Sequence, residues 1–209
     1  MGVTNIYLAR HGETEYNRCK QIQGRGIDAS LNDTGRCQAQ AIAHHLKDAE
    51  LNRIFSSSLK RSLETAEIVG HANNLDVLPY ENLDEMNFGM SSGGPISDIE
   101  DDLNSLHQQM ERSGNVDHAT EQGESPLAVL RRASAQMQLL IREHRDTNLL
   151  FVLHGRLLRI LLSDWLQYGL ANMHRVPHSN GALYHIRWDG VEYEPVYLNK
   201  TTHLDLSST

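Results

Sequence analysis

The chain has 209 residues, with 19 Lys and Arg against 27 Asp and Glu, so its formal net charge is −8. This length allows one well-cored domain, expected over residues 1–209, and the acidic balance argues against a nucleic-acid binder. The longest apolar run, Leu149–Leu153, is far shorter than the roughly 18 residues of a membrane span, so no membrane partner is expected.

The first half of the chain alternates apolar runs with segments of helical spacing. Short runs rich in strand formers are separated by polar residues that suit helix caps. The expected elements, in chain order, are a strand over Val3–Ala9, a helix from Asn32 to Leu46, a strand over Arg53–Ser56, a helix that Ser57 or Ser58 caps and that extends to Gly70, and a strand over Leu75–Pro79.

The second half begins with a Gly/Ser-rich loop and a lid or insertion at about 90–122, and then returns to the same alternation. Strands alternating with helices indicate an α/β fold, a three-layer α/β/α sandwich around a central, mostly parallel sheet. The expected elements are the loop over Gly89–Gly94, an amphipathic segment over Ile96–Met110, a helix from Ser125 to Ile141, a strand over Asn148–Leu153, a helix over Arg156–Tyr168, and a hairpin of Leu183–Trp188 and Val191–Leu198.

Two of the apolar strands end in His-Gly, at His11 and at His154. Ligands in open α/β sheets gather beyond the carboxyl ends of the strands, so the two histidines are expected to meet there. Arg10 precedes the first histidine, and Arg156 and Arg159 follow the second, with guanidinium groups that suit phosphate. The helix after His154 would add its N-terminal amides. A lone histidine at a strand end is usually structural, but two in the same context predict a phosphate site.

The other histidines do not form a recognisable metal motif. The sequence holds no HExxH and no Cys/His cluster, so neither a metal nor another cofactor is expected. His44 and His45, adjacent on a predicted helix, are interpreted as surface and boundary positions, and His203 as a packing residue. Cys19 and Cys37 lack ligand spacing and are expected as reduced thiols of a cytoplasmic protein.

The segment LARHGETEYN, Leu8–Asn17, resembles the signature of the histidine phosphatase superfamily, which contains the cofactor-dependent phosphoglycerate mutases. The likeness continues in the family's order over most of the chain and implies a phosphoglycerate mutase-like fold. It includes QGR (Gln23–Arg25), LNDTGRCQA (Leu31–Ala39), SSLKRSLETA (Ser57–Ala66), LDEMNFG (Leu83–Gly89), GES (Gly123–Ser125), VLHGRLLR (Val152–Arg159) and NKTTHL (Asn199–Leu204).

The resemblance implies that His11 is the nucleophile, which takes up the phosphoryl group as a phosphohistidine. Arg10, Arg61 and His154 match positions that bind the phosphoryl oxygens and stabilise their charge during transfer. Arg156 stands where many relatives have a small or apolar residue; it either contacts a second anionic group of the substrate or pairs with an acidic neighbour. The further expected phosphate-binding residues are Asn17, Gln23, Gly24 and Gly155.

The reaction also needs a proton donor for the leaving alkoxide, and the same group can later deprotonate the attacking water. A carboxyl group suits both tasks. Glu85 matches the family's Leu-x-Glu followed by Gly, although spacing alone does not separate it from Asp84 or Glu81. Glu13 is the rival acid in the first motif, with capping or orienting the turn as its expected task.

Hydrolysis is predicted over mutase chemistry, because a mutase needs a basic, closed pocket and the segment between Glu85 and Gly123 holds one Arg and no Lys. The predicted activity is metal-independent phosphomonoester hydrolysis of a small phosphorylated metabolite, which is also the expected partner. A phosphoglycerate mutase and a weakly catalytic phospho-ligand binder stay open as alternatives. The lid sets the natural substrate, and a homodimer is an open alternative to a monomer.

Overall fold

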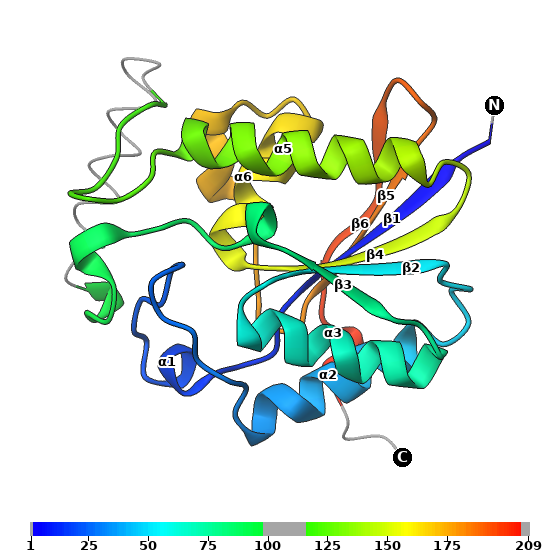
Figure 1. The fold of residues 1–209 in the computed structure, drawn as a ribbon, viewed down its shortest axis with the longest axis horizontal. Coiled ribbons are helices and arrows are strands. Elements are labelled where there is room, and N and C mark those ends of the chain that lie inside the picture. Colours follow the sequence, from blue (N-terminus) through cyan, green and yellow to red (C-terminus); the bar gives the residue numbers. More distant parts are fainter. Residues whose placement is uncertain (1, 98–115, 206–209) are drawn as a thin grey trace.

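The computed structural model describes residues 2–97 and 116–205, and in them six strands form one sheet of order β3-β2-β4-β1-β5-β6 (Figure 1). The first four strands in this order run parallel, and the C-terminal hairpin extends the sheet antiparallel. The strands are β1 (Thr4–Arg10), β2 (Arg53–Ser57), β3 (Val77–Tyr80), β4 (Asn148–Leu153), β5 (Leu183–Trp188) and β6 (Tyr193–Lys200).

Helices cover both faces of this sheet, with α2 and α3 on one side and α5 and α6 on the other (Figure 1). The described α-helices are α1 (Glu15–Arg18), α2 (Asp33–His45), α3 (Lys60–Asn73), α5 (Pro126–Glu143) and α6 (Gly155–Trp165), and the 3-10 helices are η1 (Glu81–Leu83), η2 (Gly89–Ser91), η3 (Leu170–Arg175) and η4 (Thr202–Leu204).

The central strands divide the interior into two cores because their side chains alternate between faces. In β4, Leu149 and Phe151 pack with the residues of α5 and α6, whereas Leu150 and Val152 pack with those of α2 and α3. All four side chains are fully buried, as expected for a strand covered on both faces. The predicted α/β/α sandwich with a mostly parallel sheet is confirmed.

Two of the three predicted helix caps are present. The side chains of Asn32 and Ser125 each accept a backbone N–H from the first turn of α2 and α5. The predicted cap of α3 is wrong, because the N-cap position is Leu59, which makes no side-chain cap bond. The hydroxyls of Ser57–Ser58 instead donate to the Asp84 carboxylate, which ties the end of β2 to the segment after η1.

The lid expected at about 90–122, with its amphipathic segment over Ile96–Met110, lies largely outside the described residues. Its described start is bound to the loop after α1, and its two described ends are bound to each other. The Ile96 N–H donates to the Lys20 carbonyl (2.8 Å), and the Met90 N–H donates to the Glu121 carbonyl (3.2 Å). Gly89 has φ +55°, and a Cβ there would lie 1.9 Å from the Glu121 oxygen, so this position requires glycine.

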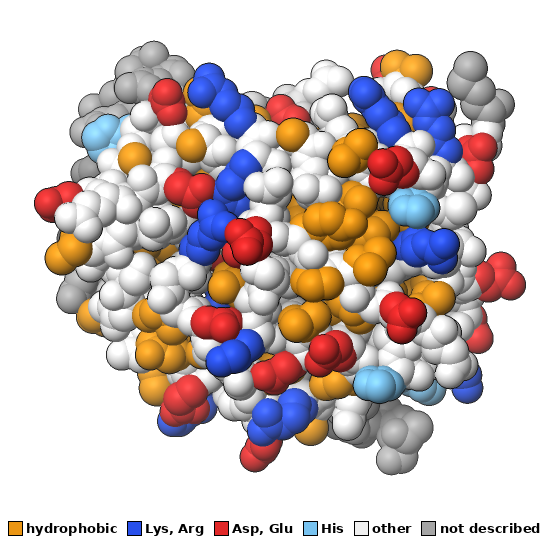
Figure 2. Space-filling model, in the orientation of Figure 1, with side chains coloured by type: hydrophobic (Ala, Val, Ile, Leu, Met, Phe, Trp, Pro, Cys, Tyr) orange, Lys and Arg blue, Asp and Glu red, His pale blue; other side chains and the backbone are white. Residues whose placement is uncertain are grey.

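On the face shown in Figure 2, hydrophobic side chains gather over the edge strand β3, between α3 and α5. Leu78 on β3 and Leu139 on α5 are among the exposed apolar residues. Pro79 has no backbone N–H to offer, which limits pairing of this edge with another strand. Among the described helices, none combines the length and apolarity needed to cross a membrane.

Candidate active site

His11 directly follows β1 and is buried, with 3% of its surface exposed. Its Nδ1 lies 2.7 Å from the carbonyl oxygen of Gly12. Because a carbonyl oxygen can only accept, Nδ1 carries the proton and Nε2 carries the lone pair. Burial, together with the positive charges of Arg61 and Arg10, holds the pKa of His11 well below its usual range. The imidazole is therefore neutral at physiological pH, with Nε2 in the form that attacks phosphorus.

His154 follows β4, the parallel neighbour of β1, and its ring centroid lies 5.2 Å from that of His11. The two His-Gly turns thus meet at the carboxyl end of the sheet. His154 is fully buried, and neither ring nitrogen has a hydrogen-bond partner among the described residues. Burial and the charge of Arg61 hold its pKa well below the usual range. A buried ring N–H without an acceptor is costly, which indicates a ligand at this point.

Arg10 and Arg61 face this point with guanidinium groups that the backbone anchors. The terminal nitrogens of Arg61 donate to the carbonyls of Ile27 and Gly24, each at 2.8 Å, and Nη1 of Arg10 donates to the carbonyl of His178. The Nε of each arginine is buried without a partner in the described part of the chain. Burial lowers the pKa of Arg61 to about 10, which leaves it a cation at neutral pH.

The loop after α1 and α1 itself add polar groups. Gln23 is buried, and its amide oxygen has no partner among the described residues. Gly24 has φ +59°, and a Cβ there would lie 2.9 Å from the carbonyl oxygen of Met86, so only glycine fits. Asn17 accepts a bond from Asn180 on its Oδ1 (3.1 Å), which leaves its Nδ2 as the donor available to an anion.

Glu85 caps the N-terminus of α6 with its carboxylate. Oε2 accepts the N–H of Arg156 (3.0 Å), and Oε1 accepts the N–H groups of Leu157 (3.0 Å) and Met86 (2.9 Å). The sequence analysis expected these helix amides to bind phosphate. That expectation is wrong for residues 156 and 157, because the carboxylate occupies their N–H groups. Burial lowers the pKa of Arg10, and the nearby charge of Glu85 offsets part of that lowering.

The structure separates Glu85 from its three rivals. Asp84 is committed to Arg25, whose Nε lies 3.3 Å from Oδ2, and to the serines at the end of β2. The Glu81 side chain is 82% exposed. Glu13 accepts a bond from the side chain of Asn32 (2.8 Å) and so orients the first turn, as expected.

Gly155 and Arg156 form the first turn of α6. A Cβ on Gly155 would lie 2.7 Å from the His178 ring and 3.2 Å from Arg10 Nε, so this glycine lets the Arg10 side chain pack against the helix. Arg156 is buried, with its guanidinium carbon 5.9 Å from the centroid of the Phe88 ring. Burial and the charge of Arg159 lower the pKa of Arg156 to about 10, so it adds a further positive charge.

Three residues that the sequence analysis did not assign also shape the site. Asn180 donates to the carbonyl of His11 (3.3 Å), and Thr65 accepts the N–H of Gly12 (3.1 Å). His178 packs on Gly155, and burial with nearby arginines lowers its pKa to about 3. Thr65 lies within the SSLKRSLETA motif and could have been found there, whereas the segment before β5 carries no spacing signal.

Together, the site has two neutral histidines, two anchored guanidiniums and a carboxylate at one end of the sheet. Its unpartnered N–H donors, the Nε of Arg10 and Arg61 and the ring N–H of His154, suit the oxygens of a tetrahedral anion. Within residues 2–97 and 116–205, no three His, Cys, Asp or Glu side chains are grouped so as to hold a metal ion. This arrangement can bind a phosphoryl group and present a nitrogen nucleophile to it.

A sequence model of the histidine phosphatase superfamily (branch 1) matches residues 6–201. The chain belongs to this superfamily. It is 35% identical to a probable phosphoglycerate mutase GpmB of Proteus mirabilis over 164 residues, which are 77% of this chain and 74% of that protein. It is 38% identical to the fructose-2,6-bisphosphatase TIGAR B of Danio rerio over 107 residues, which are 49% of this chain and 42% of that protein.

Solved structures share the fold of this superfamily member. Bacillus stearothermophilus YhfR is 27% identical with a TM-score of 0.83, covering 97% of this chain and 100% of that one. A mycobacterial glucosyl-3-phosphoglycerate phosphatase complexed with VO3 is 25% identical with a TM-score of 0.84, and the match covers 94% of this chain and 99% of that one. A phosphoserine phosphatase of Entamoeba histolytica has a similar fold, with a TM-score of 0.85 and 24% sequence identity. The match covers 96% of this chain and 99% of that one. The predicted family and fold are confirmed.

Proposed function

We propose that this protein is a phosphomonoester hydrolase, which transfers the phosphoryl group of a small phosphorylated metabolite first to His11 and then to water. The observation that carries the proposal is the buried, neutral His11, whose Nδ1–H is held by the Gly12 carbonyl and whose Nε2 is free to attack. Phosphatases among the related proteins and structures support the same reaction class.

In the first step, Nε2 of His11 attacks phosphorus in line with the departing oxygen. A P–N bond forms, the P–O bond to the substrate breaks, and its electron pair goes to the alkoxide, which takes a proton from Glu85 in its protonated, carboxylic acid form. Arg10, Arg61 and His154 donate to the phosphoryl oxygens. The two arginines are held by backbone carbonyls before the substrate arrives, so little reorganisation opposes the transfer.

In the second step, water attacks the phosphorus of phosphohistidine while Glu85, now a carboxylate, takes a proton from that water. The P–N bond breaks and its electron pair returns to Nε2 of His11, which leaves inorganic phosphate and the starting enzyme. The remaining contacts of the phosphoryl group are proposed to come from Asn17, Gln23 and the Gly24 turn.

The proposal includes a substrate with a second anionic group, which Arg156 would contact. Arg156 stands at the turn between the phosphate site and Phe88, next to the described start of the lid. A cytoplasmic location is also proposed, because both cysteines are free and exposed thiols, as in proteins of reducing compartments.

The test is phosphate release from a panel of phosphomonoesters in the presence of EDTA. We expect metal-independent release, and we expect acid-labile label on the protein after rapid quenching with a radiolabelled substrate. Robust interconversion of phosphoglycerates without phosphate release would favour a mutase, as the name of the GpmB relative suggests. Binding of the same esters without turnover, unchanged in His11→Ala, would favour a phospho-ligand binder.

A further inference from the structure

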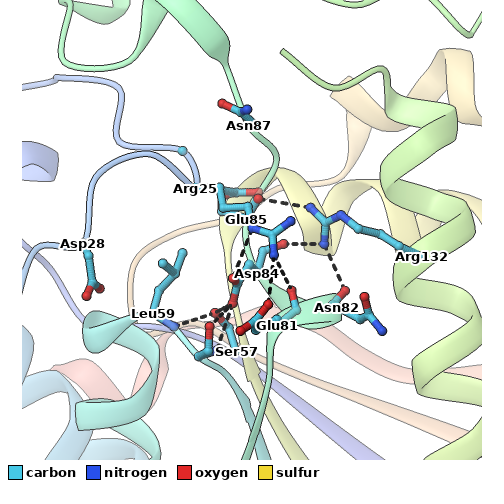
Figure 3. Close-up of polar contacts among 12 residues, drawn as sticks. Arg25, Asp28, Ser57, Leu59, Glu81, Asn82, Asp84, Glu85, Asn87 and Arg132 are labelled. Atoms are coloured by element: carbon cyan, nitrogen blue, oxygen red, sulfur yellow. Dashed lines mark hydrogen bonds and ion pairs between the residues drawn. The ribbon is translucent and has the colours of Figure 1, made fainter. Parts of the chain in front are cut away.

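Arg132 on α5 lies outside the phosphate site but holds the segment that carries Glu85 (Figure 3). Its Nη1 donates to the carbonyls of Asn82 (2.9 Å) and Asp84 (2.8 Å), and its Nη2 donates to the carbonyl of Glu85 (3.1 Å). One guanidinium thus binds three backbone oxygens within four residues. This spacing fixes the path of the chain up to Glu85.

The remaining donors of Arg132 bind Glu124, and the pair is largely buried. Nε and Nη2 donate to the two carboxylate oxygens at 2.7 and 2.9 Å, and the two side chains are 14% and 20% exposed. All five N–H donors of the guanidinium therefore have acceptors. Glu124 also accepts the N–H of Asn87 (2.8 Å), two residues beyond Glu85. The pair holds the chain on both sides of the proposed proton donor.

The side chain of Asp84 is held separately, on the opposite side of the segment from α5 (Figure 3). Its Oδ1 accepts the Ser57 hydroxyl (2.8 Å) and the Ser58 N–H (2.9 Å), and its Oδ2 pairs with Arg25. Arg25 in turn donates its backbone N–H to the Met86 carbonyl (3.1 Å). The segment is therefore attached to α5, to β2 and to the loop of Gly24, and the Glu85 side chain lies against the N-terminus of α6.

We infer that Arg132 is a positioning residue for Glu85: through its bonds to the 82, 84 and 85 carbonyls and to Glu124, it fixes the Glu85 carboxyl group at the N-terminus of α6, where the protonated form of that group can protonate the leaving group. This inference rests on the proposed function. A proton donor must lie within hydrogen-bond reach of the departing oxygen, so a small displacement of its main chain reduces the rate. A lysine cannot replace the fork, because its three donors radiate from a single nitrogen.

The experiment compares two substrates that differ in their need for a proton donor. Glycerol 2-phosphate releases an alkoxide that must be protonated, whereas p-nitrophenyl phosphate releases a stable phenolate. The readout is kcat/KM, which covers the steps up to phosphorylation of His11 and not the later attack of water. The variants are Arg132→Met and Arg132→Lys, with Glu85→Gln as the reference for loss of the donor and Arg131→Met, exposed on the same helix, as the matched control.

We expect Arg132→Met to lower kcat/KM by about 10-fold or more with glycerol 2-phosphate and by about 2-fold or less with p-nitrophenyl phosphate. The first loss is smaller than the roughly 10²- to 10⁴-fold loss expected when the acid itself is removed. Arg132→Lys should lie between Arg132→Met and wild type, and Arg131→Met should match wild type. Equal losses with both substrates would reduce Arg132 to a structural role and overturn the inference. The inference is also overturned if Glu85→Gln lowers kcat/KM more with glycerol 2-phosphate than with p-nitrophenyl phosphate but neither Arg132 variant does.

Failure of the proposed function gives results that differ from those of a failed inference about Arg132. If the wild-type protein hydrolyses neither ester, no phosphohydrolase activity exists to be positioned. If Glu85→Gln affects both substrates equally, Glu85 is not the leaving-group acid and the inference falls with it. Thermal unfolding of each variant separates a misplaced carboxylate from a smaller folded fraction, because a smaller folded fraction lowers both rates by the same factor.

Discussion

Two buried polar regions lie side by side at the carboxyl end of the sheet, and their hydrogen bonding differs. In the phosphate pocket, formed by Arg10, His11, Gln23, Arg61 and His154, five buried nitrogen or oxygen atoms have no partner within the described residues. In the Glu85 clamp, formed by Arg25, Asp84, Glu124 and Arg132, all five donors of the central guanidinium are bound.

This difference separates binding from support. Unpartnered buried groups destabilise the free protein, and the donors among them gain acceptors when an anion binds, so they are expected where a ligand sits. Fully bonded groups hold the backbone in place and have nothing left to offer a ligand. Substitutions in the phosphate pocket should therefore reduce activity and spare stability, except at Arg61, whose terminal nitrogens also bind backbone carbonyls. Substitutions in the Glu85 clamp should reduce stability as well.

The largest effect is expected from His11→Asn, which removes the nucleophile. Hydrolysis of phosphomonoesters should fall by at least about 10⁴-fold, because no covalent intermediate can form. The melting temperature should stay the same or rise, since a buried group that serves the reaction is lost. His71→Asn, an exposed position on α3, is the control. Residual turnover within about 10-fold of wild type would contradict a phosphohistidine mechanism.

Next is Arg61→Met, which removes a charge that faces the phosphoryl oxygens. A loss of about 10²- to 10³-fold in kcat is expected, as for other groups that stabilise transition-state charge. Arg61 also binds two backbone carbonyls, so a moderate loss of stability should accompany it, unlike the result for His11. Steady-state kinetics and chemical denaturation measure the two effects, with Arg53→Met as control. An unchanged kcat would place Arg61 outside the reaction.

A smaller effect, mainly on stability, is expected from Asp84→Asn. An amide keeps one acceptor oxygen but loses the ion pair with Arg25 and part of the bonding to Ser57–Ser58. Urea unfolding should show a loss of about 1–3 kcal/mol, while kcat should change less than in Arg61→Met. Asp76→Asn, exposed before β3, is the control. A large loss of kcat at unchanged stability would remove the distinction between the two regions.

The smallest effect is a pH dependence of stability from histidines that burial keeps neutral. The pKa values of His11 and His154 are held well below the usual range, and that of His178 is lowered to about 3. Below the ordinary value of about 6.5 the unfolded chain therefore binds more protons than the native state. The stability from these neutral histidines is fully present above that pH and falls as the pH decreases, by at most about 1.4 kcal/mol per pH unit for each histidine.

Urea unfolding of phosphate-free protein at pH 7.5 and 5.5, about one unit on either side of the ordinary histidine value, measures this slope. His178→Gln should make it shallower, whereas His44→Gln, on the exposed side of α2, should not. A slope that is unchanged in His178→Gln would show that this ring is not kept neutral by the fold.

Most of the fold follows from local patterns. The apolar run of β4 and the caps Asn32 and Ser125 predict their elements, because alternation and capping depend on residues close in sequence. The errors occur where a distant residue intervenes. Asp84 takes the hydroxyls expected to cap α3, and Glu85 takes the helix amides expected to bind phosphate.

The sequence by itself therefore determined the family, the sandwich and the identity of the residues around His11 and His154, because motifs and strand-end turns are formed by residues that are close in sequence. The family motif pointed to Glu85, and only the tertiary structure showed that this carboxylate lies at the N-terminus of α6 and what holds it there. The three carboxylates at 81, 84 and 85 are nearly equivalent in sequence, and the one at 85 is distinguished by amides of α6 that lie some 70 residues away. Such contacts depend on packing in three dimensions, which spacing along a chain does not encode.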